Sequence, residues 1–116
     1  MTPTEESLRS FALGFPSTTE EFPWGERALK VSGKVFVFLY AGPDALKLTV
    51  KLKEHHAEAL SYPEVRPTGY NLGKSGWVTA SFPHNAEIPM AMIQGWITES
   101  WELVAPRRLV KARQNP

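Results

Sequence analysis

Residues 45–52 carry the clearest pattern in the chain, a strict alternation of apolar and polar side chains. The apolar members are Leu46, Leu48, Val50 and Leu52. The polar members between them are Lys47, Thr49 and Lys51. Because successive side chains of a β-strand point to opposite faces, the pattern predicts a strand with one buried face and one face that is at least partly in water.

Two strands are predicted before this one. Arg27–Val31 and Lys34–Tyr40 flank Ser32-Gly33, a dipeptide typical of two-residue hairpin turns. Lys34–Tyr40 is apolar on both faces, which predicts a central strand. Alternate side chains of this strand share one face, so the polar face of the sheet must also carry either Phe36, Phe38 and Tyr40 or Val35, Val37 and Leu39.

Two more strands are predicted later in the chain, at Gly69–Leu72 and Trp77–Phe82, around a turn at Gly73–Gly76. Helices are predicted over residues 3–13, 53–61, 86–104 and 107–114, and proline-rich loops over residues 15–25 and 62–67. The expected fold is a single α+β domain over residues 1–116, with two layers. A five-stranded antiparallel sheet carries helices on one face, in the order α-β-β-β-α-β-β-α.

Composition restricts the class of protein. The 116 residues are 42% hydrophobic and include no cysteine, so disulfides and cysteine-based zinc sites are excluded. The first residues have no basic segment followed by an apolar one, and no apolar run approaches the roughly 18 residues of a membrane span. We therefore expect a cytoplasmic protein that does not enter a membrane.

Charge is distributed unevenly along the chain. Residues 1–26 hold one arginine against five glutamates, a net charge of −4, whereas residues 27–116 hold twelve basic against seven acidic residues, a net charge of +5. The last twelve residues contain Arg107, Arg108, Lys111 and Arg113 and no acid. A polyanion would be attracted to this part, although a solvated surface with a basic helix end is the simpler interpretation.

The segment TGYNLGKSGW at residues 68–77 resembles a phosphate-binding loop, but it fails the structural requirements of one. The required spacing is G-x-x-x-x-G-K-[ST] between a buried strand and a helix. Here Thr68 stands where the first glycine should be, Pro67 precedes it, and the strand-like sequence WVTASF follows. The sequence therefore predicts a turn between two strands and no nucleotide site.

No catalytic constellation is found elsewhere. His55 and Glu58 are three residues apart on a predicted helix, but two ligands do not make a metal site. Glu20 and Glu21 are adjacent carboxylates with no sign of a buried acid. We expect no enzyme activity, no metal and no cofactor. A deep pocket lined by Glu20, Glu21, Trp24 and Trp77 would be needed to restore the enzyme hypothesis.

One face of the predicted sheet combines cations with rings. Strand parity places Lys30, Lys47, Thr49 and Lys51 on one side, and Trp77, Thr79 and Ser81 can share it. Such a surface resembles a platform for nucleic-acid phosphates and bases. Two alternatives remain: the polar side chains solvate an uncovered face, or the rings form a surface for a protein partner or a dimer.

Five motifs in order resemble those of the MmcQ/YjbR family. They are EEFPWG at residues 20–25, LKVSGKVF at residues 29–36, LKLTVK at residues 46–51, YNLGKSGWV at residues 70–78 and SWELV at residues 100–104. The resemblance covers about residues 5–113. Leu29 stands where an aromatic residue is common, and Trp101 replaces the usual tyrosine.

The resemblance implies a small α+β fold similar to those of type III secretion chaperones and CyaY-like proteins. It also implies a non-enzymatic DNA-binding function in which hairpins act as a double wing. The family offers no catalytic residues to transfer. The alternative is a protein- or small-ligand-binding module, and a monomer is favoured over a homodimer.

The DNA-binding hypothesis predicts contacts mainly to phosphates. The residues expected to make them are Lys30, Lys34, Lys47, Lys51, Lys74, Arg107 and Arg108. Trp77 is expected to stack on a base or wedge between two. Lys34 and Lys74 are placed at hairpin turns, from which they would reach the DNA.

Overall fold

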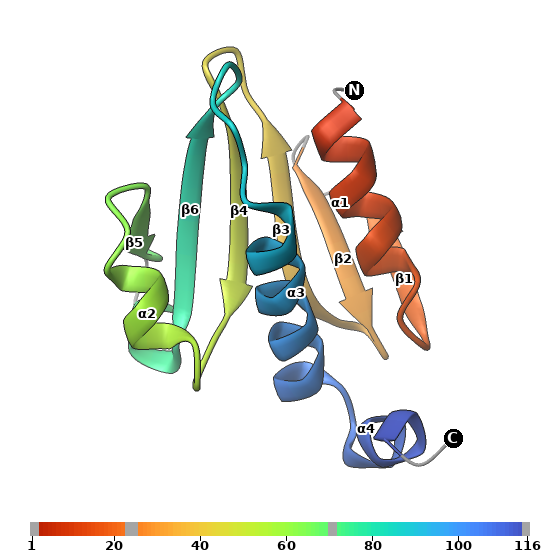
Figure 1. The fold of residues 1–116 in the computed structure, drawn as a ribbon. Coiled ribbons are helices and arrows are strands. Elements are labelled where there is room, and N and C mark those ends of the chain that lie inside the picture. Colours follow the sequence, from red (N-terminus) through yellow and green to blue (C-terminus); the bar gives the residue numbers. More distant parts are fainter. Residues whose placement is uncertain (1–2, 23–25, 70–71, 115–116) are drawn as a thin grey trace.

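The computed structural model describes residues 3–22, 26–69 and 72–114. Its helices are α1 (Pro3–Leu13), α2 (His56–Leu60), α3 (Met90–Val104) and α4 (Arg107–Gln114). Its strands are β1 (Thr18–Glu21), β2 (Arg27–Val31), β3 (Lys34–Ala41), β4 (Ala45–Lys51), β5 (Val65–Pro67) and β6 (Trp77–Pro83), and a 3-10 helix, η2, covers Leu72–Ser75. The fold is α+β, as predicted (Figure 1).

The strands form one antiparallel sheet in the order β1-β2-β3-β4-β6-β5. The prediction of five strands in the order α-β-β-β-α-β-β-α was wrong in two respects. The sheet has six strands, and four of them, not three, precede α2. The strands β1 and β5 form the two edges of the sheet, and the prediction failed at both edges.

The additional strand, β1, lies in the segment that was predicted to be a loop. Its sequence, TTEE, has no apolar residue, so hydrophobic alternation could not reveal it. As an edge strand it pairs only with β2, in a register that runs from Thr18 opposite Val31 to Glu21 opposite Ala28. Glu20 points to the side of the sheet that carries the helices, where two arginines bind its carboxylate.

The other edge strand also differs from the prediction. The strand expected at Gly69–Leu72 is replaced by β5 at Val65–Pro67, and Leu72–Ser75 forms η2. Pro67 has no N–H to donate, and an edge strand tolerates this loss because one of its sides has no partner strand. The connection between β5 and β6 is therefore longer than the tight turn expected at Gly73–Gly76. Tyr70 and Asn71 lie outside the described residues.

A bulge decides which side chains of β3 face which side of the sheet. Leu29 pairs with Val37 but Lys30 pairs with Val35, so Phe36 is an extra residue between two paired positions. Phe36 and Val37 are both buried in the core. Neither of the two sets expected from simple alternation is correct, because the face away from the core receives Val35, Phe38 and Tyr40.

Helices lie on only one face of the sheet within the described part of the chain. In Figure 1, α1, α2 and α3 are in front of the strands. The core lies between these two layers, and its largest fully buried side chains are Trp96, Trp101, Phe36 and Leu8. The helix α3 begins at Met90 instead of residue 86, because Pro89 disfavours a helical conformation at the residue before it and itself serves as the N-cap. The helix α2 begins at His56 instead of residue 53.

Two adjacent polar residues of α3 fix the end of β4 and the start of α2. The Glu99 carboxylate accepts backbone N–H groups from Lys53 at 3.0 Å, Glu54 at 3.0 Å and His55 at 3.3 Å. The Ser100 hydroxyl accepts the N–H of Lys51 and donates to the carbonyl of Phe36. These bonds hold α3 against one face of the sheet.

The pKa of Glu99 reflects this environment. Burial of the side chain would raise its pKa, but the backbone hydrogen bonds from Lys53, His55 and Glu54 outweigh that effect and lower the pKa below its ordinary value of 4.5. The carboxylate is therefore the form that the fold stabilises.

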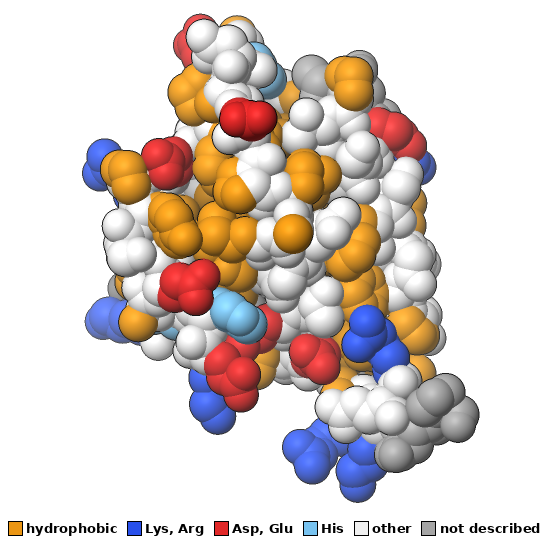
Figure 2. All heavy atoms as spheres, in the orientation of Figure 1, with side chains coloured by type: hydrophobic (Ala, Val, Ile, Leu, Met, Phe, Trp, Pro, Cys, Tyr) orange, Lys and Arg blue, Asp and Glu red, His pale blue; other side chains and the backbone are white. Residues whose placement is uncertain are grey.

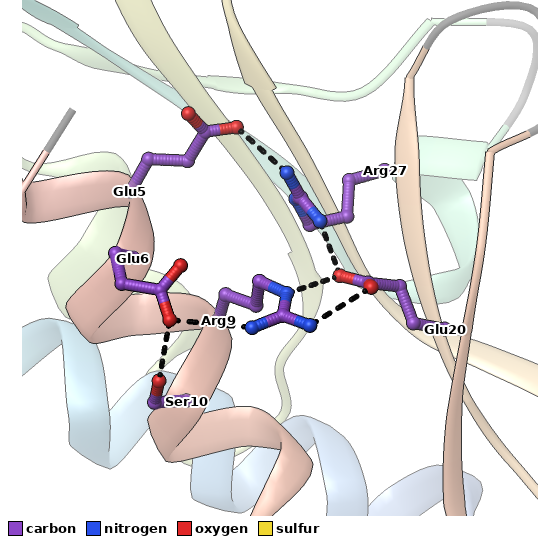
Figure 3. Close-up of polar contacts among 6 residues, drawn as sticks. All are labelled: Glu5, Glu6, Arg9, Ser10, Glu20 and Arg27. Carbon is purple, nitrogen blue, oxygen red and sulfur yellow. Dashed lines mark hydrogen bonds and ion pairs between the residues drawn. The ribbon is translucent and has the colours of Figure 1, made fainter. Parts of the chain in front are cut away.

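A second polar network attaches α1 to the sheet (Figure 3). Arg9 binds the Glu20 carboxylate through two nitrogens, at 2.7 and 3.2 Å, and Arg27 donates to the same carboxylate. Arg27 also reaches Glu5 of α1 at 3.5 Å, and Arg9 reaches Glu6 at 3.2 Å. The network occupies the space between α1 and the first two strands.

The pKa of Glu20 shows which effect is larger in this network. Burial would raise its pKa, but the hydrogen bonds and charges of Arg9 and Arg27 lower it below the ordinary value of 4.5. The ionised network is thus part of what keeps α1 on its side of the sheet.

Candidate nucleic-acid interface

The sheet face opposite the helices, called the open face below, is defined by the strand register. From β1 to β5 in sheet order it carries Thr19, Glu21, Ala28, Lys30, Val35, Phe38, Tyr40, Ala45, Lys47, Thr49, Lys51, Trp77, Thr79, Ser81, Pro83 and Arg66. Lys30, Lys47, Lys51 and Trp77 therefore share one side, as strand parity predicted. No helix of the described residues packs on this side, which lies behind the sheet in Figure 1.

Three aromatic rings lie on the open face. The rings of Phe38 on β3 and Trp77 on β6 are tilted against one another with centroids 6.2 Å apart, so they meet across the intervening strand β4. Both side chains are half-buried. Tyr40 lies two positions after Phe38 and is 41% exposed. The rings cover part of the sheet and leave an aromatic surface in contact with solvent.

The cations of the open face differ in their partners. Lys30 forms an ion pair with Glu21 at 2.7 Å. Within the residues that the structure describes, Lys47, Lys51 and Arg66 have no ion-pair partner. Sequence reasoning did not select Arg66, because it lies in a segment predicted to be a loop. The register places it opposite Thr79 and so on the open face.

Three lysines lie at one end of the sheet. Lys51 is the last residue of β4 and pairs with Trp77, the first residue of β6. Lys34, the first residue of β3, and Lys74, in the connection before β6, lie at the same end of the sheet and are exposed. By register Lys34 points to the helix side, opposite Val31, but it directly follows the turn of the β2–β3 hairpin. This group of Lys34, Lys51, Lys74 and Trp77 is called the cationic end below.

Acidic residues adjoin the opposite end of the open face. Glu26 precedes β2, and the carbonyl of Glu64 accepts the N–H of Ser81 at 2.9 Å. Glu26 also lines a shallow depression of about 460 Å³ together with Tyr40, Lys47, Thr49 and Thr79. Among the described residues, the cations of the open face that have no ion-pair partner are therefore spread along it, with Lys51 at the cationic end, Arg66 in the middle and Lys47 beside Glu26 at the opposite end.

The predicted contacts Arg107 and Arg108 lie elsewhere. They begin α4, which follows α3 on the helix side, beyond the same end of the sheet (Figure 1). The guanidinium of Arg113 on α4 stacks over the rings of Phe15 and Trp101, at 4.8 and 5.8 Å from their centroids. Figure 2 shows Lys and Arg side chains over α4 and acidic side chains over α2 and the last turns of α3. Arg107 and Arg108 are therefore not part of the open face.

Other sites considered in the sequence have the following outcome. Among the described residues, no group of three or more His, Cys, Asp or Glu side chains is placed to hold a metal ion. Trp24, proposed for an enzyme pocket, lies outside the described residues. No helix that the structure describes is long and apolar enough to cross a bilayer.

Comparisons with known proteins agree with this architecture. A family model described as YjbR matches residues 13–103. The crystal structure of protein DR2400 from Deinococcus radiodurans, described with the family-model domain DUF419, is similar to this chain with a TM-score of 0.72 and 24% sequence identity. The match covers 96% of this chain and 88% of that one. At this identity the likeness shows the fold. No curated protein matches the sequence at a significant level.

Proposed function

The chain belongs to the YjbR family, and from that premise we propose that it is a non-enzymatic DNA-binding protein. It contacts phosphates through the cationic end of the sheet, with Lys34, Lys51 and Lys74, and through Lys47 and Arg66 further along the open face. Lys30 contributes a further contact when it leaves its ion pair with Glu21 and binds a phosphate.

The observation that carries the proposal is the position of the cations. Three lysines from three separate parts of the chain lie at one end of the sheet, and none of them has an ion-pair partner among the described residues. Phosphate contacts require only exposed positive charge at a fixed spacing, so a sheet and its turns can provide them without entering a groove.

Charge reversal at the cationic end tests the proposal. Fluorescence anisotropy of a labelled duplex should show binding at about 50 mM salt, and the six phosphate contacts named above imply a loss on the order of 1,000-fold in affinity at about 200 mM salt. The double variant Lys34→Glu/Lys74→Glu should bind at least about tenfold more weakly at the lower salt concentration, because it replaces two attractions by two repulsions.

The matched control is Arg107→Glu/Arg108→Glu, which changes the net charge by the same amount on α4. Its affinity should fall by less than about threefold, because only long-range attraction is lost. Equal losses in the two variants would mean that binding follows net charge and not this surface. An absence of binding by the wild-type protein to both the duplex and its separated strand at the lower salt concentration would end the DNA-binding proposal.

A further inference from the structure

The open face offers more than phosphate contacts, and its shape restricts the form of nucleic acid that can use it. Four neighbouring strands, β3, β4, β6 and β5, form a surface whose outer strands lie about 14 Å apart at a strand spacing of about 4.8 Å. This breadth exceeds the major groove, which is about 12 Å wide. The face as a whole therefore does not fit into the major groove of an undistorted duplex.

The aromatic rings are placed to contact bases that are not paired. Phe38 and Tyr40 occupy alternate positions of β3 and point to the same side, about 7 Å apart along the strand. Trp77 joins Phe38 from β6, and Tyr40 keeps 41% of its surface exposed. In a duplex the faces of the bases are covered by their neighbours, whereas unpaired bases stack readily on rings presented by a sheet.

The depression beside Tyr40 contains both hydrogen-bond donors and hydrogen-bond acceptors. Thr79 shares hydrogen bonds with Thr49 at 2.9 Å and with Thr68 at 3.1 Å. Three hydroxyl groups have three hydrogens and use two of them in these bonds, so one hydrogen remains to be donated. Lys47 adds a donor and Glu26 an acceptor at the same depression. The depression is shallow, so it can receive one edge of a planar base without enclosing it.

We propose that the open face binds single-stranded DNA in preference to duplex DNA. One base stacks on Tyr40 and its edge meets Glu26 and the threonine hydroxyls, while Lys47 contacts the adjoining phosphate. The strand continues along the face toward Lys51 at the cationic end. This inference rests on the proposed function, because it assigns the form of DNA that the same surface takes.

The experiment compares a labelled single strand of about 20 nucleotides with the duplex of the same sequence, by fluorescence anisotropy at about 50 mM salt. The single strand should bind at least about fivefold more tightly, because each stacked base contributes about 1–3 kcal/mol. Tyr40→Ala should weaken binding of the single strand by about 5- to 100-fold and binding of the duplex by less than about twofold. Tyr40→Phe should restore the affinity for the single strand.

Tyr62→Ala is the matched control, since Tyr62 is an exposed tyrosine whose ring contacts Trp96 on the helix side. It should leave both affinities unchanged. Duplex binding as tight as single-strand binding, or an equal loss for both in Tyr40→Ala, would overturn this inference while the DNA-binding function stands. Binding of neither DNA would overturn both.

Discussion

Replacement of Arg27 by methionine is expected to lower the free energy of unfolding by about 3–5 kcal/mol, because it removes a buried cation from two carboxylates. The Arg27 side chain is 8% exposed, and it binds Glu20 and Glu5, which are 16% and 9% exposed. Methionine keeps most of the apolar volume, so the loss reports on charge. After the replacement Arg9 still binds Glu20, but each carboxylate has lost a cation in a site with little water. Urea unfolding followed by circular dichroism measures the difference.

Arg66→Met is the matched control, because Arg66 is exposed and lies on the opposite side of the sheet. Its effect on stability should stay within about 0.5 kcal/mol. The effect of pH gives a second check. The pKa of Glu20 is lower in the folded than in the unfolded state. Its ionised form therefore stabilises the fold above pH 4.5, and this contribution is lost as the pH falls through the pKa of the folded state. The difference in the free energy of unfolding between wild type and Arg27→Met should therefore become smaller in acid. A difference that stays constant between neutral pH and acid would contradict the account.

Removal of the Glu99 carboxylate should destabilise the protein by about 3 kcal/mol, because it leaves three backbone N–H groups without an acceptor in a site that is mostly buried. The Glu99 side chain is 10% exposed, and it bonds to Lys53, Glu54 and His55. Glu99→Ala should therefore loosen the segment between β4 and α2 first. Hydrogen exchange of these three amides, together with urea unfolding, measures both effects.

Glu102→Ala is a suitable control, since Glu102 lies three residues further along α3 and is partly exposed. It should change stability by no more than about 0.5 kcal/mol. Glu99→Gln should fall between the two variants, because an amide keeps one acceptor oxygen and loses the charge. If Glu99→Ala were as stable as Glu102→Ala, the carboxylate would have no structural role.

The sequence predicted the interior of the sheet better than its edges. The strand β4 was identified because every second residue is apolar and that face is buried. The strands β1 and β5 were not, because an edge strand needs only one row of partners and tolerates the sequence TTEE or a proline. The bulge at Phe36 was also invisible, since a strand that is apolar on both faces has no alternation to reveal a change of register.

The candidate surface was predicted in part for the same reasons. Lys47 and Lys51 followed from the alternation in β4, and Trp77 from that in β6. Arg66 was not identified because its strand was predicted to be a loop. Arg27 and Glu99, whose polar contacts hold the fold together, could not be recognised from the sequence because their partners lie far away along the chain. The family resemblance was confirmed by the match to residues 13–103. The roles of the individual residues in DNA binding remain predictions.

The most direct test of the open face is to follow backbone amide signals by NMR while single-stranded DNA is added. The account predicts that the largest shifts occur at Lys47, Thr49, Lys51, Arg66 and Trp77, and that the amides of α3 and α4 change little. Shifts confined to α2, α3 or α4 would place the contact on the helix side and contradict the account.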